Sequence, residues 1–301
     1  MLARLQQAIV ASLLLLAVAW GLGSRDLPGW VVLAGFLAIA LAHAVFLALE
    51  FLLMHAINRH DPAARVGLVA LARAWVAESV AAPRVFLWQQ PFHSQRWPDR
   101  IPDGRPDQPG RRGVVFVHGF VCNRGLWNSW LRRLDGQARV FCAVNLEPVF
   151  GSIEDYVPLI DAAVHRVRQA TGVPPLVVCH SMGGLAVRAW LRERQADARV
   201  AQVVTLGTPH GGTWLARLSF VANGSQMRQD SHWLAQLRRD EPAGRAALFT
   251  CYYSACDNIV FPASAAVLPG ARHIPVPGVA HVAMVFEPTV IEQVLASLDA
   301  L

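Results

Sequence analysis

The N-terminal part of the chain contains two long apolar runs with very few polar positions. Residues 8–23 are almost unbroken apolar sequence, and residues 30–57 form a longer run interrupted only by two histidines and Glu50. A helix of about 20 apolar residues crosses a bilayer. The second run meets that length by itself, and the first does so when residues 2–7 are partly counted. The pattern predicts a transmembrane helical hairpin, a two-helix membrane anchor at residues 1–58.

The first run also has features of a secretory signal, with Arg4 before an apolar stretch and Ala17-Val18-Ala19 as a candidate cleavage site. Several arginines follow the second run, whereas the turn at residues 24–29 between the runs has no net charge. By the positive-inside rule, both ends of a retained hairpin face the cytoplasm. We favour the retained helix, which places the remainder of the chain in the cytoplasm.

Two ionisable positions interrupt the second run. Glu50 and His43 are seven residues apart and therefore share one face of the predicted helix. An ionisable residue within a membrane helix is a functional hypothesis by default. We favour the plainer interpretation, a contact between helices or an interfacial position in an overlong span.

Residues 59–112 have a different pattern. Residues 62–81 place apolar side chains at helical spacing with a proline near the start, which predicts a membrane-proximal amphipathic helix. From residue 83 to residue 112 prolines and arginines accumulate. That composition predicts a linker, with one strand at Val85 to Gln89.

Beyond Gly113, short apolar runs alternate with amphipathic segments up to residue 301. Strands are predicted at residues 113–117, 139–144, 176–179, 200–206 and 248–254, and helices at 126–134, 154–170 and 182–194. Continuous apolar strands between helices are typical of an α/β fold with a mostly parallel sheet and helices on both faces. In such sheets active sites lie beyond the carboxyl ends of the strands.

The charge and the cysteine content limit which classes of partner and cofactor we expect. Residues 58–112 hold nine Arg and five Asp or Glu, a surplus of four positive charges within a chain of net charge +6. That surplus suits an anionic membrane surface, and no nucleic-acid motif accompanies it, so we expect no nucleic acid partner. The five cysteines form no C-x-x-C or Cys/His pattern. We therefore expect reduced thiols, no metal and no cofactor.

The third predicted strand ends in Cys-His-Ser-Met-Gly-Gly at residues 179–184 and leads directly into a helix. A sharp strand-to-helix corner exposes the Ser181 hydroxyl and leaves space only for small neighbours. The pattern G-x-S-x-G has cysteine at its first position here. A lone serine before a helix is usually an N-cap, so a nucleophile also requires a base and an acid. Asp257 follows the predicted strand at residues 248–254, and His281 follows the segment Arg272 to Val279, so both residue types are present.

Four motifs in chain order extend this observation: VFVHGF from Val115, CHSMGG from Cys179, LGTPHGGT from Leu206, and SACDNIVFP from Ser254 followed by GVAHVAMV. The region from about Val114 onward resembles the α/β-hydrolase superfamily and, within it, the bacterial lipases and lipase-like esterases. The resemblance implies an α/β-hydrolase catalytic domain at residues 113–301.

The resemblance also implies roles. Ser181 would be the nucleophile, His281 the general base and Asp257 the carboxylate that orients the imidazole, while the backbone N–H groups of Phe120 and Met182 would form the oxyanion hole. The structural alternative for Asp257 is an Asx turn, which the pair Asp257-Asn258 favours. The alternatives for the acid are Asp230, Glu241 and Asp161. The histidines that we expect to serve as scaffold are His118, His180 and His210, with His180 pointing away from the nucleophile.

The substrate class follows from less specific features. Residues 211–245 form an apolar insertion, which is either a lid over the site or ordinary helix packing. With membrane helices nearby, the sequence predicts a membrane-anchored serine hydrolase of lipid acyl or other carboxylic esters, located in a bacterial inner membrane. A thioesterase, an acyltransferase and a non-catalytic membrane scaffold with a hydrolase-like domain are the alternatives.

Overall fold

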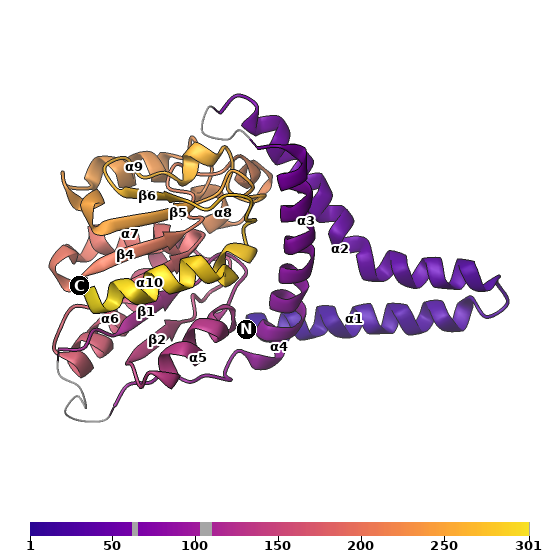
Figure 1. The fold of residues 1–301 in the computed structure, drawn as a ribbon, viewed down its shortest axis with the longest axis horizontal. Helices are drawn as coiled ribbons and strands as arrows, with labels where there is room; N and C mark the ends of the chain where they lie inside the picture. Colours follow the sequence, from indigo (N-terminus) through magenta and orange to yellow (C-terminus); the bar gives the residue numbers. More distant parts are fainter. Residues whose placement is uncertain (62–65, 103–109, 301) are drawn as a thin grey trace.

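A single six-stranded parallel sheet forms the centre of the main domain (Figure 1). The computed structural model describes residues 1–61, 66–102 and 110–300. The strands are β1 (Val114–Val117), β2 (Phe141–Val144), β3 (Leu176–His180), β4 (Gln202–Leu206), β5 (Phe249–Tyr253) and β6 (Arg272–Pro275). Their spatial order is β2-β1-β3-β4-β5-β6. Because every pairing is parallel, all carboxyl ends lie along one edge of the sheet.

Helices cover both faces of this sheet (Figure 1). On one face α6 (Val157–Thr171) and α7 (Met182–Arg194) pack on the strands, and on the other face α5 (Asn128–Gly136) and α10 (Pro288–Ala300) do so. Alternate strand residues therefore enter two separate apolar cores, since successive side chains point to opposite faces of a strand. The predicted α/β fold is confirmed, and the strand bounds differ from the prediction by only a few residues.

Two long helices precede the sheet and form a hairpin that projects away from it (Figure 1). They are α1 (Leu2–Gly23) and α2 (Gly29–Asn58). By length and composition both are apolar enough to cross a membrane. Most of their large apolar side chains are exposed.

The first part of the predicted linker, up to His93, is helical. α3 (Leu68–Pro83) continues directly into a π-helix, η1 (Arg84–Gln89), and then α4 (Gln90–His93). The predicted strand at Val85 to Gln89 is therefore wrong. Val85 is fully buried among side chains of the second core, and the helix widens after Pro83, which supplies no backbone N–H. The predicted amphipathic helix begins at Leu68; its proposed start at Pro62, like part of the linker, lies outside the described residues.

The segment at residues 211–245 contains α8 (Ala222–Gln226) and α9 (His232–Asp240). Leu234 and Leu237 of α9 are buried in the core beside α7, which is ordinary helix packing. Short 3-10 helices occur at Arg124–Trp127, Ile153–Tyr156, Asp197–Arg199, Trp214–Leu218, Arg245–Leu248, Ala263–Ala266 and Ala283–Phe286.

Candidate active site

Ser181 lies at the carboxyl edge of the sheet, between the end of β3 and the start of α7. Its backbone has φ 54° and ψ −129°, a region that non-glycine residues rarely occupy. Holding a residue there costs on the order of 1–3 kcal/mol and is common at functional sites. Although Ser181 occupies the N-cap position, its side chain makes no capping hydrogen bond. The hydroxyl is thus available for a role other than capping.

Glycines make this corner possible. A Cβ on Gly183 would lie against the carbonyl oxygens of Val117 and His118, the second at 2.6 Å. A Cβ on Gly119 would lie 2.7 Å from the Cβ of Ser181. The loop after β1 and the start of α7 therefore approach the serine more closely than side chains would permit.

Asp257 and His281 form a buried pair next to this corner. His281 donates from Nδ1 to Oδ2 of Asp257 over 2.8 Å, and both side chains are almost fully buried. The other carboxylate oxygen of Asp257 accepts the backbone N–H groups of Ile259 and Val260. Asp257 thus forms a local turn and holds the imidazole at the same time. With the proton on Nδ1, the lone pair of Nε2 can accept another proton.

The electrostatic surroundings raise the pKa of the His281 imidazole. Burial by itself lowers the pKa of His281, but the negative charges of Asp257 and Glu78 outweigh it, so the net shift is upward. An imidazole with a raised pKa is a stronger base once it is neutral. This suits a residue that takes a proton from a hydroxyl.

The other candidates for the acid are engaged elsewhere. Glu241 binds the guanidinium of Arg188 through both oxygens, at 2.7 and 2.8 Å. Asp161 accepts from Trp190 and Arg199, and the side chain of Asp230 is 92% exposed. None of these contacts involves His281.

The three scaffold histidines are buried and hydrogen-bonded. Burial lowers the pKa of His118 to about 4, and this ring bridges the carbonyl of Gly119 and the N–H of Leu146. Burial also holds the pKa of His210 well below its usual value; its ring contacts Thr205. These two residues stay neutral and connect loops.

His180 differs from the prediction that it points away from the nucleophile. Its ring centre lies 4.6 Å from that of His281, and both rings line the cavity over Ser181. Nε2 of His180 is 3.2 Å from the backbone carbonyl of His281. Burial and the neighbouring imidazole hold the pKa of His180 well below its usual value, so it supports His281 as a neutral donor.

Cys179, the irregular residue of the serine motif, is a core side chain. It is fully buried and faces the apolar core that contains α7. Burial raises the pKa of its thiol well above the usual value, and nearby Cys251 adds to the rise. A thiol in this state is unreactive.

The two candidate oxyanion donors flank the corner. Met182 is the first residue of α7, and Phe120 follows Gly119, whose backbone lies against Ser181. Phe120 also lines the cavity together with Ser181 and His281. Both residues therefore adjoin the serine corner.

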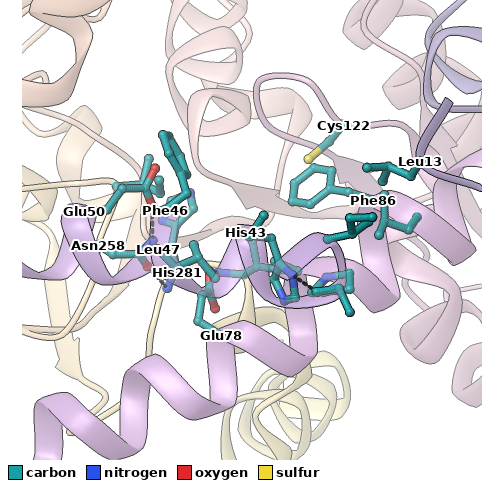
Figure 2. A pocket seen from close by; sticks show the side chains of 18 of the residues that line it. Leu13, His43, Phe46, Leu47, Glu50, Glu78, Phe86, Cys122, Asn258 and His281 are labelled. Carbon is teal, nitrogen blue, oxygen red and sulfur yellow. Dashed lines mark hydrogen bonds between the residues drawn. The ribbon is translucent and has the colours of Figure 1, made fainter. Parts of the chain in front are cut away.

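Glu78 is a site residue that sequence reasoning missed. This side chain of α3 is fully buried, and its two carboxylate oxygens accept the N–H groups of Val282 and Ala283 at 2.8 and 2.9 Å. It therefore holds the backbone directly after His281 (Figure 2). Burial raises the pKa of Glu78, and the two backbone donors oppose that rise. The signal in the sequence was a single carboxylate within an apolar helix.

The two ionisable residues of the second apolar run, His43 and Glu50, have different roles in the structure. His43 contacts the carbonyl of Ser79 at 3.0 Å, which is a contact between α2 and α3. Glu50 instead accepts from the side chain of Asn258 at 2.8 Å, next to Asp257 (Figure 2). The interpretation as a helix contact thus fits His43 and not Glu50, which reaches the loop that carries the acid.

A cavity of about 740 Å³ lies over Ser181 and His281. Side chains of α1, α2, α3 and η1 line it, together with Phe120 and Asn258, as Figure 2 shows in part. None of the described residues that line it belongs to the segment at 211–245. In the part of the chain that the structure describes, no three His, Cys, Asp or Glu side chains gather as metal ligands.

The parallel sheet, the strained serine at the end of β3 and the later acid and histidine define the α/β-hydrolase fold, and the chain has this fold. No family model and no curated protein sequence matches it. Among solved structures, the mature form of Bacillus licheniformis lipase BlEst2 is similar, with a TM-score of 0.57 and 19% identity over 65% of this chain and 95% of that one. Aspergillus fumigatus lipase B has a TM-score of 0.56 and 17% identity, covering 66% of this chain and 55% of its own.

Proposed function

We propose that this chain is a membrane-anchored serine hydrolase that cleaves carboxylic esters, with lipid acyl esters as its substrate class. One observation carries the proposal. His281, which is hydrogen-bonded to buried Asp257 over 2.8 Å, lines the same cavity as Ser181, and the Ser181 side chain makes no capping hydrogen bond. The similar solved structures that are lipases support the ester as substrate.

The geometry supports a two-step reaction through an acyl-enzyme. Ser181 Oγ forms a bond to the ester carbonyl carbon while its proton passes to Nε2 of His281. The tetrahedral intermediate then collapses, the bond to the leaving alcohol breaks, and the imidazolium returns the proton to that oxygen. In the second step His281 takes a proton from water, whose oxygen bonds to the acyl carbon. The bond between that carbon and Ser181 Oγ then breaks, the imidazolium returns the proton to Oγ, and the carboxylic acid leaves. Asp257 holds the imidazole and balances its transient charge.

The oxyanion of both intermediates would accept the backbone N–H groups of Met182 and Phe120. One such donor contributes roughly 3 kcal/mol in the transition state. Because the donors are backbone groups, the identity of the Phe120 side chain would matter for packing rather than for charge stabilisation.

Membrane attachment rests on the hairpin of α1 and α2. Large apolar side chains are exposed along both helices, including Leu15 at 69% and Leu33 at 58%. A retained first helix is favoured because Leu2 and Gln6 are buried, and Gln6 hydrogen-bonds to Gln90 of α4. The arginine-rich segment after α2 suits a cytoplasmic membrane surface, so we assign residues 1–58 as anchor, 59–112 as a membrane-proximal connection and 113–301 as a cytoplasmic catalytic domain of the inner membrane.

The same machinery would serve a thioesterase, or an acyltransferase in which an alcohol replaces water. A non-catalytic scaffold is a different class of protein. It is disfavoured because nothing else in the structure explains why a strained serine lies beside a buried, hydrogen-bonded His-Asp pair.

The test is covalent labelling of the full chain in detergent with a fluorophosphonate. We expect labelling of the wild type, none in a Ser181→Ala variant, and strongly reduced labelling in His281→Ala. Ser129→Ala is the matched control because Ser129 lies on α5, away from the cavity over Ser181. Absence of labelling in a folded wild type contradicts the enzyme assignment.

Turnover of p-nitrophenyl esters, acyl-CoA thioesters and phospholipids by the same variants then distinguishes the substrate classes. Ester turnover that is lost in Ser181→Ala supports the proposal. Turnover of thioesters alone supports the thioesterase.

A further inference from the structure

The cavity over Ser181 is built largely by the anchor helices. Its lining includes Leu13 and Ala17 of α1 and Phe36 and Ile39 of α2, together with Ser181 and His281. Figure 2 shows Leu13 and Phe86 on one side of this space and His281 on the other. Binding at the candidate active site therefore involves the hairpin directly.

The chemistry of the walls points to a hydrocarbon chain as the occupant. Apart from His43 and Glu50, the hairpin side chains that line it are aliphatic or aromatic. The ionisable side chains along the cavity already have protein partners: both ring nitrogens of His43 contact carbonyls, both oxygens of Glu78 accept backbone N–H groups, and Glu50 accepts from Asn258. A polar ligand group placed against the apolar side chains would find no partner, and an unpaired buried polar group is costly.

The cavity also has an open side. Leu14 of α1 and Phe46 of α2 line the cavity and are 63% and 62% exposed, so the cavity is open beside the hairpin. If these helices span a bilayer, the opening faces lipid acyl chains rather than water.

We propose that the acyl chain of the substrate enters sideways from the bilayer and lies between α1 and α2, with its ester carbonyl at Ser181. This inference rests on the proposed ester hydrolase function and specifies it: the substrate is a long-chain membrane lipid, and the anchor is its acyl-binding site.

Cavity-filling variants of the full chain test this inference. Ala17→Phe and Ala40→Phe place a ring among the lining residues. The matched controls are Ala19→Phe and Ala38→Phe, because these exposed residues lie two positions away on the same helices and do not line the cavity.

In the lining variants we expect kcat/KM for p-nitrophenyl palmitate to fall about tenfold or more relative to p-nitrophenyl butyrate, since single apolar contacts discriminate substrates by about 10–200-fold. The controls should keep the wild-type ratio. An unchanged ratio in the lining variants overturns the inference. A wild type that neither reacts with fluorophosphonate nor turns over any ester instead contradicts the proposed function itself.

A second measurement locates the chain. A long-chain alkyl fluorophosphonate with a terminal diazirine is attached to Ser181 in vesicles of phosphatidylethanolamine and phosphatidylglycerol and then irradiated. Cross-links to peptides of α1 or α2 support the inference. Cross-links confined to residues 211–245 overturn it and favour the lid interpretation of that segment.

Discussion

The backbone of Ser181 has a φ of 54°, and the residues that follow it have almost no room for side chains. The tight positions are Gly183 and Gly184, and both features follow from one requirement, that a strand turn into a helix within a single residue. The backbone conformation of Ser181 therefore depends more on close packing of its neighbours than on hydrogen bonds of its own. Gly183 is the position at which this dependence is sharpest.

We expect Gly183→Ala to lower stability by about 1–3 kcal/mol, the usual cost of overpacking, and to reduce fluorophosphonate labelling. The reason is that its Cβ would meet the backbone of Val117 and His118, which cannot rotate away. Thermal unfolding and labelling rate measure the two effects. Gly136→Ala is the control, because no atom lies within 4 Å of a Cβ at that position. Equal stability of both variants would show that the corner is looser than described.

His281 gives the site its pH dependence. The imidazole must be neutral to accept the proton of Ser181, and its raised pKa means that activity is lost as the pH falls through a value above the usual 6.5. Glu78 contributes to that rise and also holds the backbone after His281. It is a positioning residue rather than a catalytic one.

Removing this charge should move the pH profile. In Glu78→Gln we expect the acidic limb of kcat/KM to shift to lower pH, because a nearby negative charge no longer favours the imidazolium. Glu292→Gln on α10 is the control, since that side chain is exposed. Superimposable profiles for Glu78→Gln and wild type would contradict the electrostatic role, whereas lower activity at every pH without a shift would indicate a purely structural one.

At the scale of elements, α2 combines two environments in one helix. Its 30 residues span about 45 Å at 1.5 Å per residue, which exceeds the hydrocarbon thickness of a bilayer. The C-terminal part lies on the main domain: Glu50 binds Asn258, and Asn58 accepts the N–H of Ala263. The excess length is therefore used to reach the loop that carries Asp257.

This contact is expected to stabilise the loop. Glu50→Leu leaves the amide of Asn258 without its acceptor, which costs about 1–3 kcal/mol, and should lower both the melting temperature and kcat. Glu50→Gln retains an acceptor oxygen and should largely restore both quantities. Leu52→Ala is the control on the same helix because its side chain is 66% exposed. If Glu50→Leu and Glu50→Gln behave alike, the charge of Glu50 matters rather than the hydrogen bond.

The connection from α3 to α4 shows how packing overrides local pattern. Valine and aromatic residues from Val85 to Trp88 have high strand propensity, yet they form a π-helix. Burial of Val85 and Gln90 against the main domain fixes this helix, and the sequence of the segment does not contain that information.

At the scale of the whole molecule, the exposed apolar surface continues from the hairpin onto α3 and η1, where Val80 and Trp88 are 68% and 60% exposed. Phe220, which is 94% exposed, adds an apolar side chain on the segment at 211–245. Exposed large apolar side chains on these elements fit the proposed membrane attachment.

The whole chain should accordingly stay in the membrane fraction after washes with molar salt and with alkaline carbonate. Salt screens attachment by basic residues, but it does not weaken burial of apolar helices in lipid. Immunoblots of pellet and supernatant measure the outcome. Release by salt would show that the arginine-rich segment, and not the hairpin, holds the protein.

The sequence by itself determined most strands and helices beyond residue 113, the two apolar helices, and Ser181, Asp257 and His281 as candidate site residues. These features depend on local periodicity and on motifs whose residues are close in the chain, so they can be read without coordinates. The corner at Ser181 belongs to this group, because its glycines adjoin it in the sequence.

Only the tertiary structure decided how the N-terminal third of the chain contributes to the candidate active site. Glu78 lies about two hundred residues before the backbone that it holds, Glu50 binds the loop of Asp257, and α1 and α2 wall the cavity over the serine. No periodicity or motif encodes such contacts. They arise when a buried carboxylate finds distant backbone donors and apolar helices pack over an active site, and both depend on how the whole chain folds.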